Sequence, residues 1–256
     1  MRKGENGCFM QKFCSTIARR SPRPLGLLGS AGMAPGTPRM EEAAPAEEEG
    51  RDRYVGEKND KGEFHGKGSL RYANGETYEG TFLHDLQDGH GTHRWPSGAS
   101  YEGEWIAGVR TGVGSYIFPD GAKFVGRFKA NVREGAKGEY VWINGETYTG
   151  SFKADKRDGP GLFLWSSGRS DLCTFAKGLP KGEGVRWSAD KQRAWRLKDG
   201  VQGEEMSLEA ADAEKAAFEK AAEAADQKEQ AAAAKEAAKR ADKAAKEAAK
   251  AKKKKR

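Results

Sequence analysis

A short unit recurs through the middle of this chain, from Tyr54 to Trp187, with a period of 23 or 24 residues. An aromatic residue opens each of the first five units and an aspartate opens a degenerate sixth, at Tyr54, Tyr78, Tyr101, Phe124, Tyr148 and Asp171. Glycine stands two positions after each of the first five openings. So short and regular a period is typical of one supersecondary unit stacked on copies of itself. Such arrays usually bind and hold other molecules, which favours an interaction protein over an enzyme.

Each unit has the residue pattern of a β-hairpin with one aromatic face. In Tyr101–Trp105 (YEGEW) the two rings and the glycine between them share one face of a strand, because side chains alternate with a period of two. We expect structural roles for these repeated positions, which are the rings Tyr78, Phe82, Tyr101, Trp105, Phe124, Phe128, Tyr148 and Phe152 and the glycines Gly80, Gly103, Gly126 and Gly150. The glycine leaves a notch in which a ring of the neighbouring strand can lie. Gly103→Val should therefore cost about 2–3 kcal/mol, although valine itself favours strands.

A second aromatic column stands 17 or 18 residues after each opening. Its members are Tyr72, Trp95, Phe118, Trp142 and Trp165, and Trp187 continues it one residue early. The opposite face carries charged residues such as Glu102 and Arg127, so the sequence predicts an antiparallel sheet with one aromatic face and one solvent-exposed face. We expect the two strands of a hairpin to be joined through a glycine pair such as Gly112/Gly114. Successive hairpins are expected to join through turns such as PDG at Pro119–Gly121.

These phased residues resemble the MORN repeat family, whose units are 23-residue hairpins in an elongated curved sheet. The resemblance covers residues 54 to about 193. The segments NDKGEFHGKG (59–68), NGETYEG (74–80) and INGETYTGSF (143–152) are also similar to axonemal radial-spoke-head MORN proteins. That resemblance implies a non-catalytic scaffold subunit in the radial spoke head of a cilium or flagellum, docked to the other radial-spoke-head proteins. An alternative, implied by other MORN-containing proteins, is a module that tethers a complex to anionic membrane lipids.

Composition divides the chain into three segments. Residues 1–53 are predicted to be a disordered extension, with seven Lys/Arg and one acid in residues 1–40. Residues 54–203, the predicted array, hold 22 bases and 19 acids, which is too balanced for a nucleic-acid surface. Residues 204–256 are rich in Ala, Lys and Glu and are predicted to form a long helix. This helix has no heptad seam, so a single solvated helix is expected rather than a coiled coil.

The predicted helix is acidic over residues 204–234 and basic over residues 235–256, as the helix macrodipole favours. Its basic end offers a candidate electrostatic contact for lipid or for acidic protein segments, made by Lys252, Lys253, Lys254, Lys255 and Arg256. A solvated helix end is the other interpretation. The Arg-rich residues 1–40 have the composition of a transit peptide, but we favour a plain extension in which Met33 opens an acidic leader.

No residue pattern indicates catalysis, a cofactor, a metal or a small-molecule substrate. The glycine pairs lead into further strands rather than into a helix, so they do not predict a phosphate-binding loop. His84, Asp85, Asp88 and His90 lack the spacing of metal ligands. Cys173 stands where the repeat has glycine, which favours a buried structural thiol over a nucleophile. Three cysteines without a disulfide or metal spacing favour a reducing compartment.

Overall fold

The computed structural model describes residues 51–254, without the side chains of Ala244 and of residues 247–256. Most of the predicted extension, residues 1–50, therefore lies outside the described residues. The candidate contact residues Lys252–Arg256 lie outside the described side chains as well.

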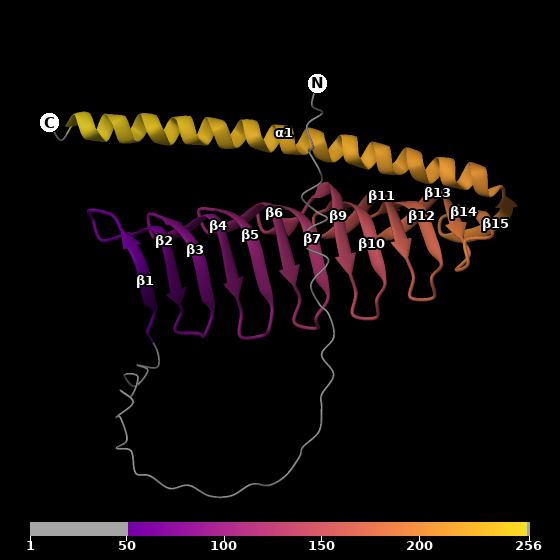
Figure 1. Cartoon of the computed structure of the whole chain (residues 1–256), viewed down its shortest axis with the longest axis horizontal. Helices are drawn as coiled ribbons and strands as arrows, with labels where there is room; N and C mark the ends of the chain where they lie inside the picture. Colours follow the sequence, from indigo (N-terminus) through magenta and orange to yellow (C-terminus); the bar gives the residue numbers. More distant parts are fainter. Residues whose placement is uncertain (1–50, 255–256) are drawn as a thin grey trace, which may run out of the picture. The chain divides into compact units, whose positions relative to one another are not determined.

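A single antiparallel sheet of fifteen strands occupies residues 53–206 (Figure 1), which confirms the predicted all-β repeat array. The strands follow one another across the sheet in chain order, except that the short β8 pairs with β7 beside β9. The strands are β1 Arg53–Lys58, β2 Phe64–Arg71, β3 Thr77–Leu83, β4 Leu86–Arg94, β5 Ser100–Ile106, β6 Val109–Ile117, β7 Lys123–Lys129, β8 Val132–Arg133, β9 Gly135–Val141, β10 Thr147–Lys153, β11 Lys156–Leu164, β12 Ser170–Ala176, β13 Leu179–Trp187, β14 Ala194–Lys198 and β15 Val201–Met206.

Two-residue turns close the hairpins from β3 onward, and the prediction that the glycine pairs join the strands was wrong. Between β5 and β6 the turn is Ala107–Gly108, with φ angles of 49° and 78°. Positive φ at both positions defines the turn type whose twist matches that of paired strands. The pair Gly112/Gly114 lies inside β6, where the register with β5 shifts beside Gly103. Glycine at this position serves a β-bulge rather than a loop.

Each pair of facing glycines makes room for a ring that comes from one of their two strands. Gly103 pairs with Gly114 across β5 and β6, and a Cβ on Gly114 would lie 2.5 Å from the Tyr101 ring. The Tyr101 hydroxyl donates a hydrogen bond to the Glu104 carbonyl at 3.1 Å, so the ring lies along β5 over both glycines. Our expectation of a ring from the neighbouring strand was therefore wrong. Tyr101 stands two positions before Gly103 on the same face of β5, and its side chain leans along that strand over the glycine.

The core is a single layer of rings on one face of the sheet. Tyr101 is fully buried and meets Trp105 and Phe128 edge-to-face, with ring centroids 5.1 and 5.0 Å apart. Apart from Trp187, the rings singled out in the sequence lie in this cluster or pack against it, namely Tyr54, Tyr72, Tyr78, Phe82, Trp95, Tyr101, Trp105, Phe118, Phe124, Phe128, Trp142, Tyr148, Phe152 and Trp165. Edge-to-face pairs of this kind add about 0.5–1.5 kcal/mol each beyond the area they bury.

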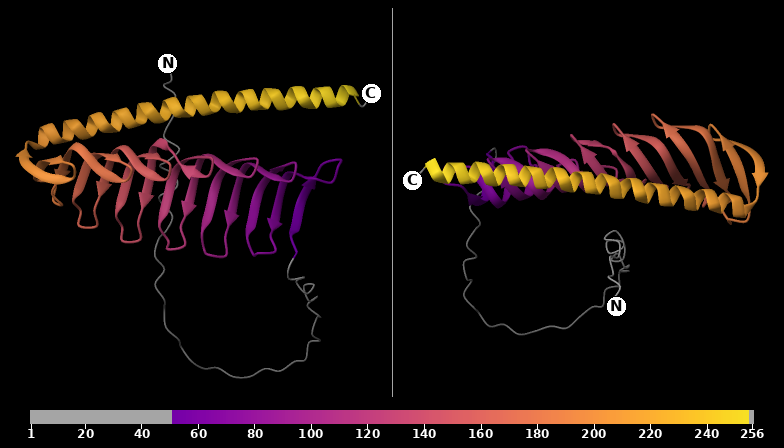
Figure 2. Two further views of the ribbon diagram at one scale, coloured as in Figure 1. Left: turned by 180° about the vertical axis from the view of Figure 1, so that it is seen from behind. Right: turned by 90° about the horizontal axis from the view of Figure 1, so that it is seen from above.

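The helix α1 (Leu208–Lys254) returns along the sheet from the β15 end toward β1 (Figures 1 and 2). It begins at Leu208 rather than at the predicted residue 204, because Val201–Met206 pair with β14 as an edge strand. Its first turns bury a second apolar cluster, which contains Leu172, Val185, Trp187, Ala194 and Ala211. At this end of the sheet the face predicted to be solvent-exposed is therefore covered, and the helix is not a solitary one.

Trp187 does not belong to the aromatic column in which the sequence placed it. It pairs with Ser170 and Ala194, and its Nε1 donates a hydrogen bond to Asp212 of α1 at 3.2 Å. A displacement of one residue along a strand moves a side chain to the opposite face. Trp187 therefore anchors the helix, and Ser188 occupies the column position.

Ion pairs hold α1 over the middle of the sheet. Arg127 of β7 lies 3.6 Å from Asp226 and 3.5 Å from Glu229, and Lys137 of β9 lies 3.8 Å from Glu223. Glu229 also accepts a hydrogen bond from the backbone N–H of Ala136 at 3.2 Å. Farther along, the basic half of the helix reaches an acidic position of the sheet, where Arg240 pairs with Asp88. The acidic first half of the helix thus docks on basic positions of the array.

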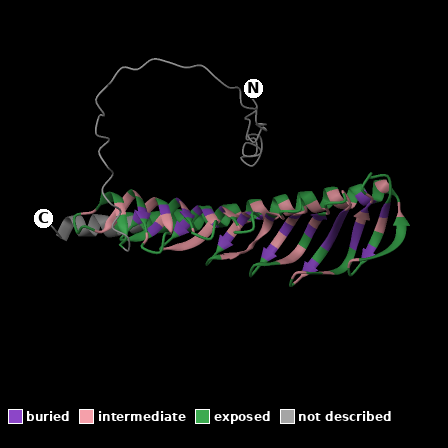
Figure 3. Cartoon of the chain, turned by 90° about the horizontal axis from the view of Figure 1, so that it is seen from below, coloured by how far each residue is buried: buried purple, intermediate pink, exposed green. Residues whose placement is uncertain are grey.

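We expect the two halves of α1 to exchange backbone amide hydrogens at different rates. Residues 208–229 are held by buried Ala211 and by the ion pairs, whereas all side chains of residues 231–243 are exposed (Figure 3). A helix stretch without packing opens readily. Hydrogen exchange followed by mass spectrometry should therefore show protection in residues 208–229 larger by on the order of tenfold than beyond residue 235. Uniform exchange along the helix would contradict the docked arrangement.

Candidate functional site

One continuous row of rings runs across the aromatic face of the sheet. Its neighbouring ring centroids are 4.3–5.8 Å apart from β2 to β11. The row, which we call the aromatic ladder, consists of Tyr72, His93, Trp95, Tyr116, Phe118, Tyr140, Trp142, Phe163 and Trp165. All except His93 and Phe163 are only partly buried. The ladder is thus both core and accessible surface, on the face that α1 does not cover.

Three arginines, which the sequence analysis overlooked, lie against the ladder at equivalent positions of successive repeats. They are Arg110, Arg133 and Arg157, spaced by one repeat each. The Arg133 guanidinium lies 5.5–5.7 Å from the centroids of four rings, and Arg157 has a similar set at 4.7–6.0 Å. Cation–π attraction of this kind is strongest where the cation is shielded from water. The repeat spacing itself was the signal that could have identified this arginine column.

The arginines also tie each repeat to the next. Arg133 donates from Nε to Asp155 Oδ1 at 3.0 Å and from a terminal nitrogen to the Asp155 carbonyl at 2.8 Å. One repeat earlier along the chain, Arg110 makes the same contacts with Asn131 of the following hairpin. Because Asn131 and Asp155 are turn residues of the following hairpins, each arginine sets the position of its neighbour. Burial lowers the pKa of Arg157, but an arginine remains charged in a folded protein.

Gln87 stands where later repeats have arginine, and it holds His93 in the core. The Gln87 amide lies 3.0 Å from His93 Nδ1, and His93 Nε2 lies 2.9 Å from Glu76 Oε2. With the amide as donor to Nδ1, the neutral imidazole donates from Nε2 to the carboxylate. Burial lowers the pKa of His93, against the opposing effect of Glu76.

This lowered pKa predicts a loss of stability on acidification. Above the unfolded-state pKa, near 6.5, His93 is neutral in both states and pH has no effect through it. Below it the unfolded chain takes up the proton first, so the free energy of unfolding falls as pH decreases toward the folded-state pKa. Denaturant unfolding of the parent and of His93→Gln between pH 7.5 and 5.5 should show the parent losing more stability. A difference between the two that stays constant with pH would contradict this.

The sixth repeat replaces two rings of the core by an ion pair. Asp171 and Arg186 pair across β12 and β13 where Tyr101 and Tyr116 pair in the third repeat. Two hydrogen bonds of 2.7 and 2.8 Å join them, and Trp165 Nε1 donates to Asp171 at 2.9 Å. Cys173 is buried at the glycine position, and burial raises the pKa of its thiol to about 11. A protonated thiol at neutral pH is a poor nucleophile.

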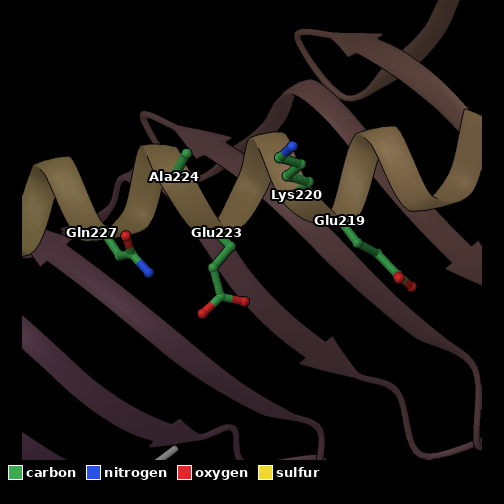
Figure 4. Close-up of a pocket in the computed structure, with 5 residues that line it drawn as sticks. All are labelled: Glu219, Lys220, Glu223, Ala224 and Gln227. Atoms are coloured by element: carbon green, nitrogen blue, oxygen red, sulfur yellow. The ribbon is translucent and has the colours of Figure 1, made fainter. Parts of the chain in front are cut away.

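One further hollow lies on the surface of the described residues. A shallow hollow beside α1 is lined by Glu219, Lys220, Glu223, Ala224 and Gln227, all from one helix (Figure 4). Within residues 51–254, no group of three or more His, Cys, Asp or Glu side chains is placed to hold a metal ion. No helix in the same range combines the length and apolar character that a membrane span requires.

Solved structures give weak likenesses. The TCP domain of SAS-4 from Drosophila melanogaster, in complex with a proline-rich motif of Ana2, is 11% identical, with 70% of this chain and 98% of that chain covered and a TM-score of 0.33. The G-box domain of the microcephaly protein CPAP is 12% identical, with 61% and 98% covered and a TM-score of 0.33. The TCP10 domain of Danio rerio CPAP, as the E1021V mutant, is 14% identical, with 56% and 76% covered and a TM-score of 0.27. At TM-scores below 0.5 these likenesses establish neither a shared fold nor a shared partner.

The comparison with curated proteins found no match. The model of the MORN repeat matches five segments, at residues 54–77, 78–100, 101–123, 148–168 and 174–193. The first four matched segments follow the hairpins that begin at β1, β3, β5 and β10, and the last covers the end of β12 and all of β13. Five segments of the fifteen-stranded sheet therefore match the MORN repeat, and the match leaves out residues 124–147 and the strands β14 and β15.

Proposed function

We propose that this chain is a non-catalytic structural subunit that docks other proteins in the radial spoke head of a ciliary or flagellar axoneme. The observation that supports the docking role is the aromatic ladder, a continuous and partly exposed row of rings on one face of the sheet. The helix α1 docks on the other face. Repeats tied by Arg110 and Arg133 present that face as a rigid surface. The similarity of residues 59–68, 74–80 and 143–152 to spoke-head proteins supports the location.

Rigid presentation favours docking because little conformational freedom is lost when a partner binds. Among the described residues the array also has two open strand edges, β1 and β15, to which an extended segment of another subunit can add. The repeats are close to neutral, so docking on them should depend on shape and apolar contact and should resist salt. Contacts of the basic end, in contrast, should weaken above about 0.2–0.3 M salt, where the Debye length is about 6 Å.

The test compares two tagged variants with the parent in cells that build motile cilia. A chain lacking residues 235–256 should remain on isolated axonemes, and crosslinking should join it to spoke-head subunits. Trp105→Ala, which removes a core ring of β5, should release the chain, with circular dichroism of the purified variant reporting whether the sheet is still folded. If removal of residues 235–256 alone clears the chain from axonemes and abolishes its sedimentation with anionic vesicles, the lipid-tethering alternative replaces this proposal.

A further inference from the structure

We propose that the aromatic ladder binds a proline-rich, acidic segment of a partner protein in the polyproline II conformation. The segment would run across the strands and advance by one turn for each repeat. This inference rests on the proposed docking function and names the chemistry of the docked partner.

The first argument is the repeat distance of the face. Neighbouring strands are about 4.8 Å apart, so one hairpin advances about 9.6 Å across the sheet. Each hairpin from β4 to β11 contributes one pair of ladder rings, for example Tyr116 with Phe118 and Tyr140 with Trp142. A polyproline II helix rises about 3.1 Å per residue with three residues per turn, or about 9.3 Å per turn. Every third residue of such a ligand therefore meets an equivalent ring pair.

Other peptide conformations fit this spacing less well. Two turns of an α-helix cover about 10.8 Å, so a helix would drift by about 1.2 Å per repeat and by about 5 Å over four repeats. A β-strand covers three residues in about 9.9 Å, but its side chains alternate, so every third residue would point away from the sheet. Among regular conformations, the left-handed three-fold helix alone combines the right step with a constant orientation.

The second argument is the supply of hydrogen-bond donors on the ladder. Trp105, Trp165 and Trp187 each donate their indole N–H to an acceptor of the chain, at 3.1, 2.9 and 3.2 Å. The indole N–H groups of Trp95 and Trp142 donate to none of the described residues, and both side chains are partly exposed. These two tryptophans lie two repeats apart. A polyproline II helix makes no internal hydrogen bonds, so its carbonyl groups are free to accept from both.

The third argument is charge. The guanidinium groups of Arg110, Arg133 and Arg157 lie beneath the ladder at intervals of one repeat. Arg133 is already paired with the Asp155 carboxylate, whereas Arg110 and Arg157 donate to carbonyl oxygens of Asn131 and Gly178. The positive potential of Arg110 and Arg157 therefore favours ligand carboxylates two repeats apart. An acidic, proline-rich segment therefore complements the face in spacing, in hydrogen bonding and in charge.

The test uses the full chain and synthetic peptides with blocked ends. The probe is (Pro-Pro-Glu)₅, titrated while tryptophan fluorescence and heat are measured. One control peptide has the same composition in an order without the three-residue period, and another is (Gly-Gly-Glu)₅, which keeps the charge without the preformed helix. We expect the probe to bind at least tenfold more tightly than either control.

Two protein variants test the geometry. Trp95→Phe with Trp142→Phe keeps both rings and removes both donors, and it should weaken binding of the probe about tenfold. The matched control is Trp187→Phe, on the opposite face, which should leave probe binding unchanged.

Equal binding of the scrambled or glycine peptide, or unchanged affinity in the double variant, overturns the proposal. So does tighter binding of an acidic, alanine-rich helical peptide. A peptide of residues 34–49, the chain's own acidic leader with Pro35, Pro38 and Pro45, is a further probe, and tighter binding of it would make the leader the occupant instead of a partner. If the chain is found on axonemes but does not bind the probe, this inference alone is contradicted. If the chain binds the probe but is absent from axonemes, the proposed location alone is contradicted.

Discussion

Gly103→Ala is expected to destabilise the array by about 3 kcal/mol, a large effect for one methyl group. A Cβ at Gly103 would lie 2.6 Å from the Gly114 Cα and 2.7 Å from the Val113 carbonyl oxygen, which are both backbone atoms. It would also lie 2.6 Å from the Tyr101 hydroxyl, so the buried ring cannot move aside without losing its hydrogen bond to Glu104. The sheet must therefore open at β5 and β6 or expel the ring.

The matched control for this change is Gly203→Ala in β15. Gly203 is also a strand glycine without positive φ, but the nearest atom to its added Cβ is the Arg196 carbonyl oxygen at 3.5 Å. Thermal unfolding should show a much lower melting temperature for Gly103→Ala and a change of about 1 kcal/mol or less for Gly203→Ala. Equal melting temperatures for the two variants would show that ring packing over paired glycines does not limit the stability of the sheet.

The sequence predicted those parts of the fold that repeat in phase. The period of 23 or 24 residues places each aromatic and each glycine on a defined face of a strand, so the ring core followed from alternation alone. The hairpin turns were misplaced because some of their residues, such as Ala107 and Lys177, are not the usual ones for positive φ. Register with the neighbouring strand, rather than local preference, sets those turns.

The docking of α1 was not predictable from helix periodicity. Between residues 231 and 243 the helix carries only alanines and polar or charged side chains, a composition that suggests a solvated helix. Over the middle of the sheet its contacts are charged, at Arg127 and Lys137, and these two residues become a pair only when β7 and β9 are adjacent. The division of the tail into an acidic and a basic half was visible in the sequence. The basic residues of the array that the acidic half contacts come together only when the sheet is folded.

The second large effect is expected at the ion pair of the sixth repeat, where Asp171→Ala should cost about 3 kcal/mol or more. The side chains of Asp171 and Arg186 are 8% and 14% exposed, so removal of the carboxylate leaves a poorly solvated guanidinium without a counterion. The control is Glu205→Ala, which breaks a pair of similar geometry with Arg193 at side-chain exposures of 50% and 59%. Water replaces the carboxylate there, so that change should cost less than about 1 kcal/mol in urea unfolding.

Further substitutions at this site can restore the lost stability, and they test why the sixth repeat has an ion pair where the other repeats have rings. In the fifth repeat Tyr148 pairs with Phe163, and its ring lies over paired Gly150 and Gly161. The sixth repeat has Cys173 opposite Gly184, so the space for a ring is occupied. The triple variant Asp171→Tyr, Cys173→Gly, Arg186→Phe should therefore regain the stability lost in Asp171→Ala. The double variant that keeps Cys173 should not, because its new ring meets the Cys173 side chain. If the double variant were as stable as the triple, the paired glycines would not be what admits the ring, and the ion pair would need another explanation.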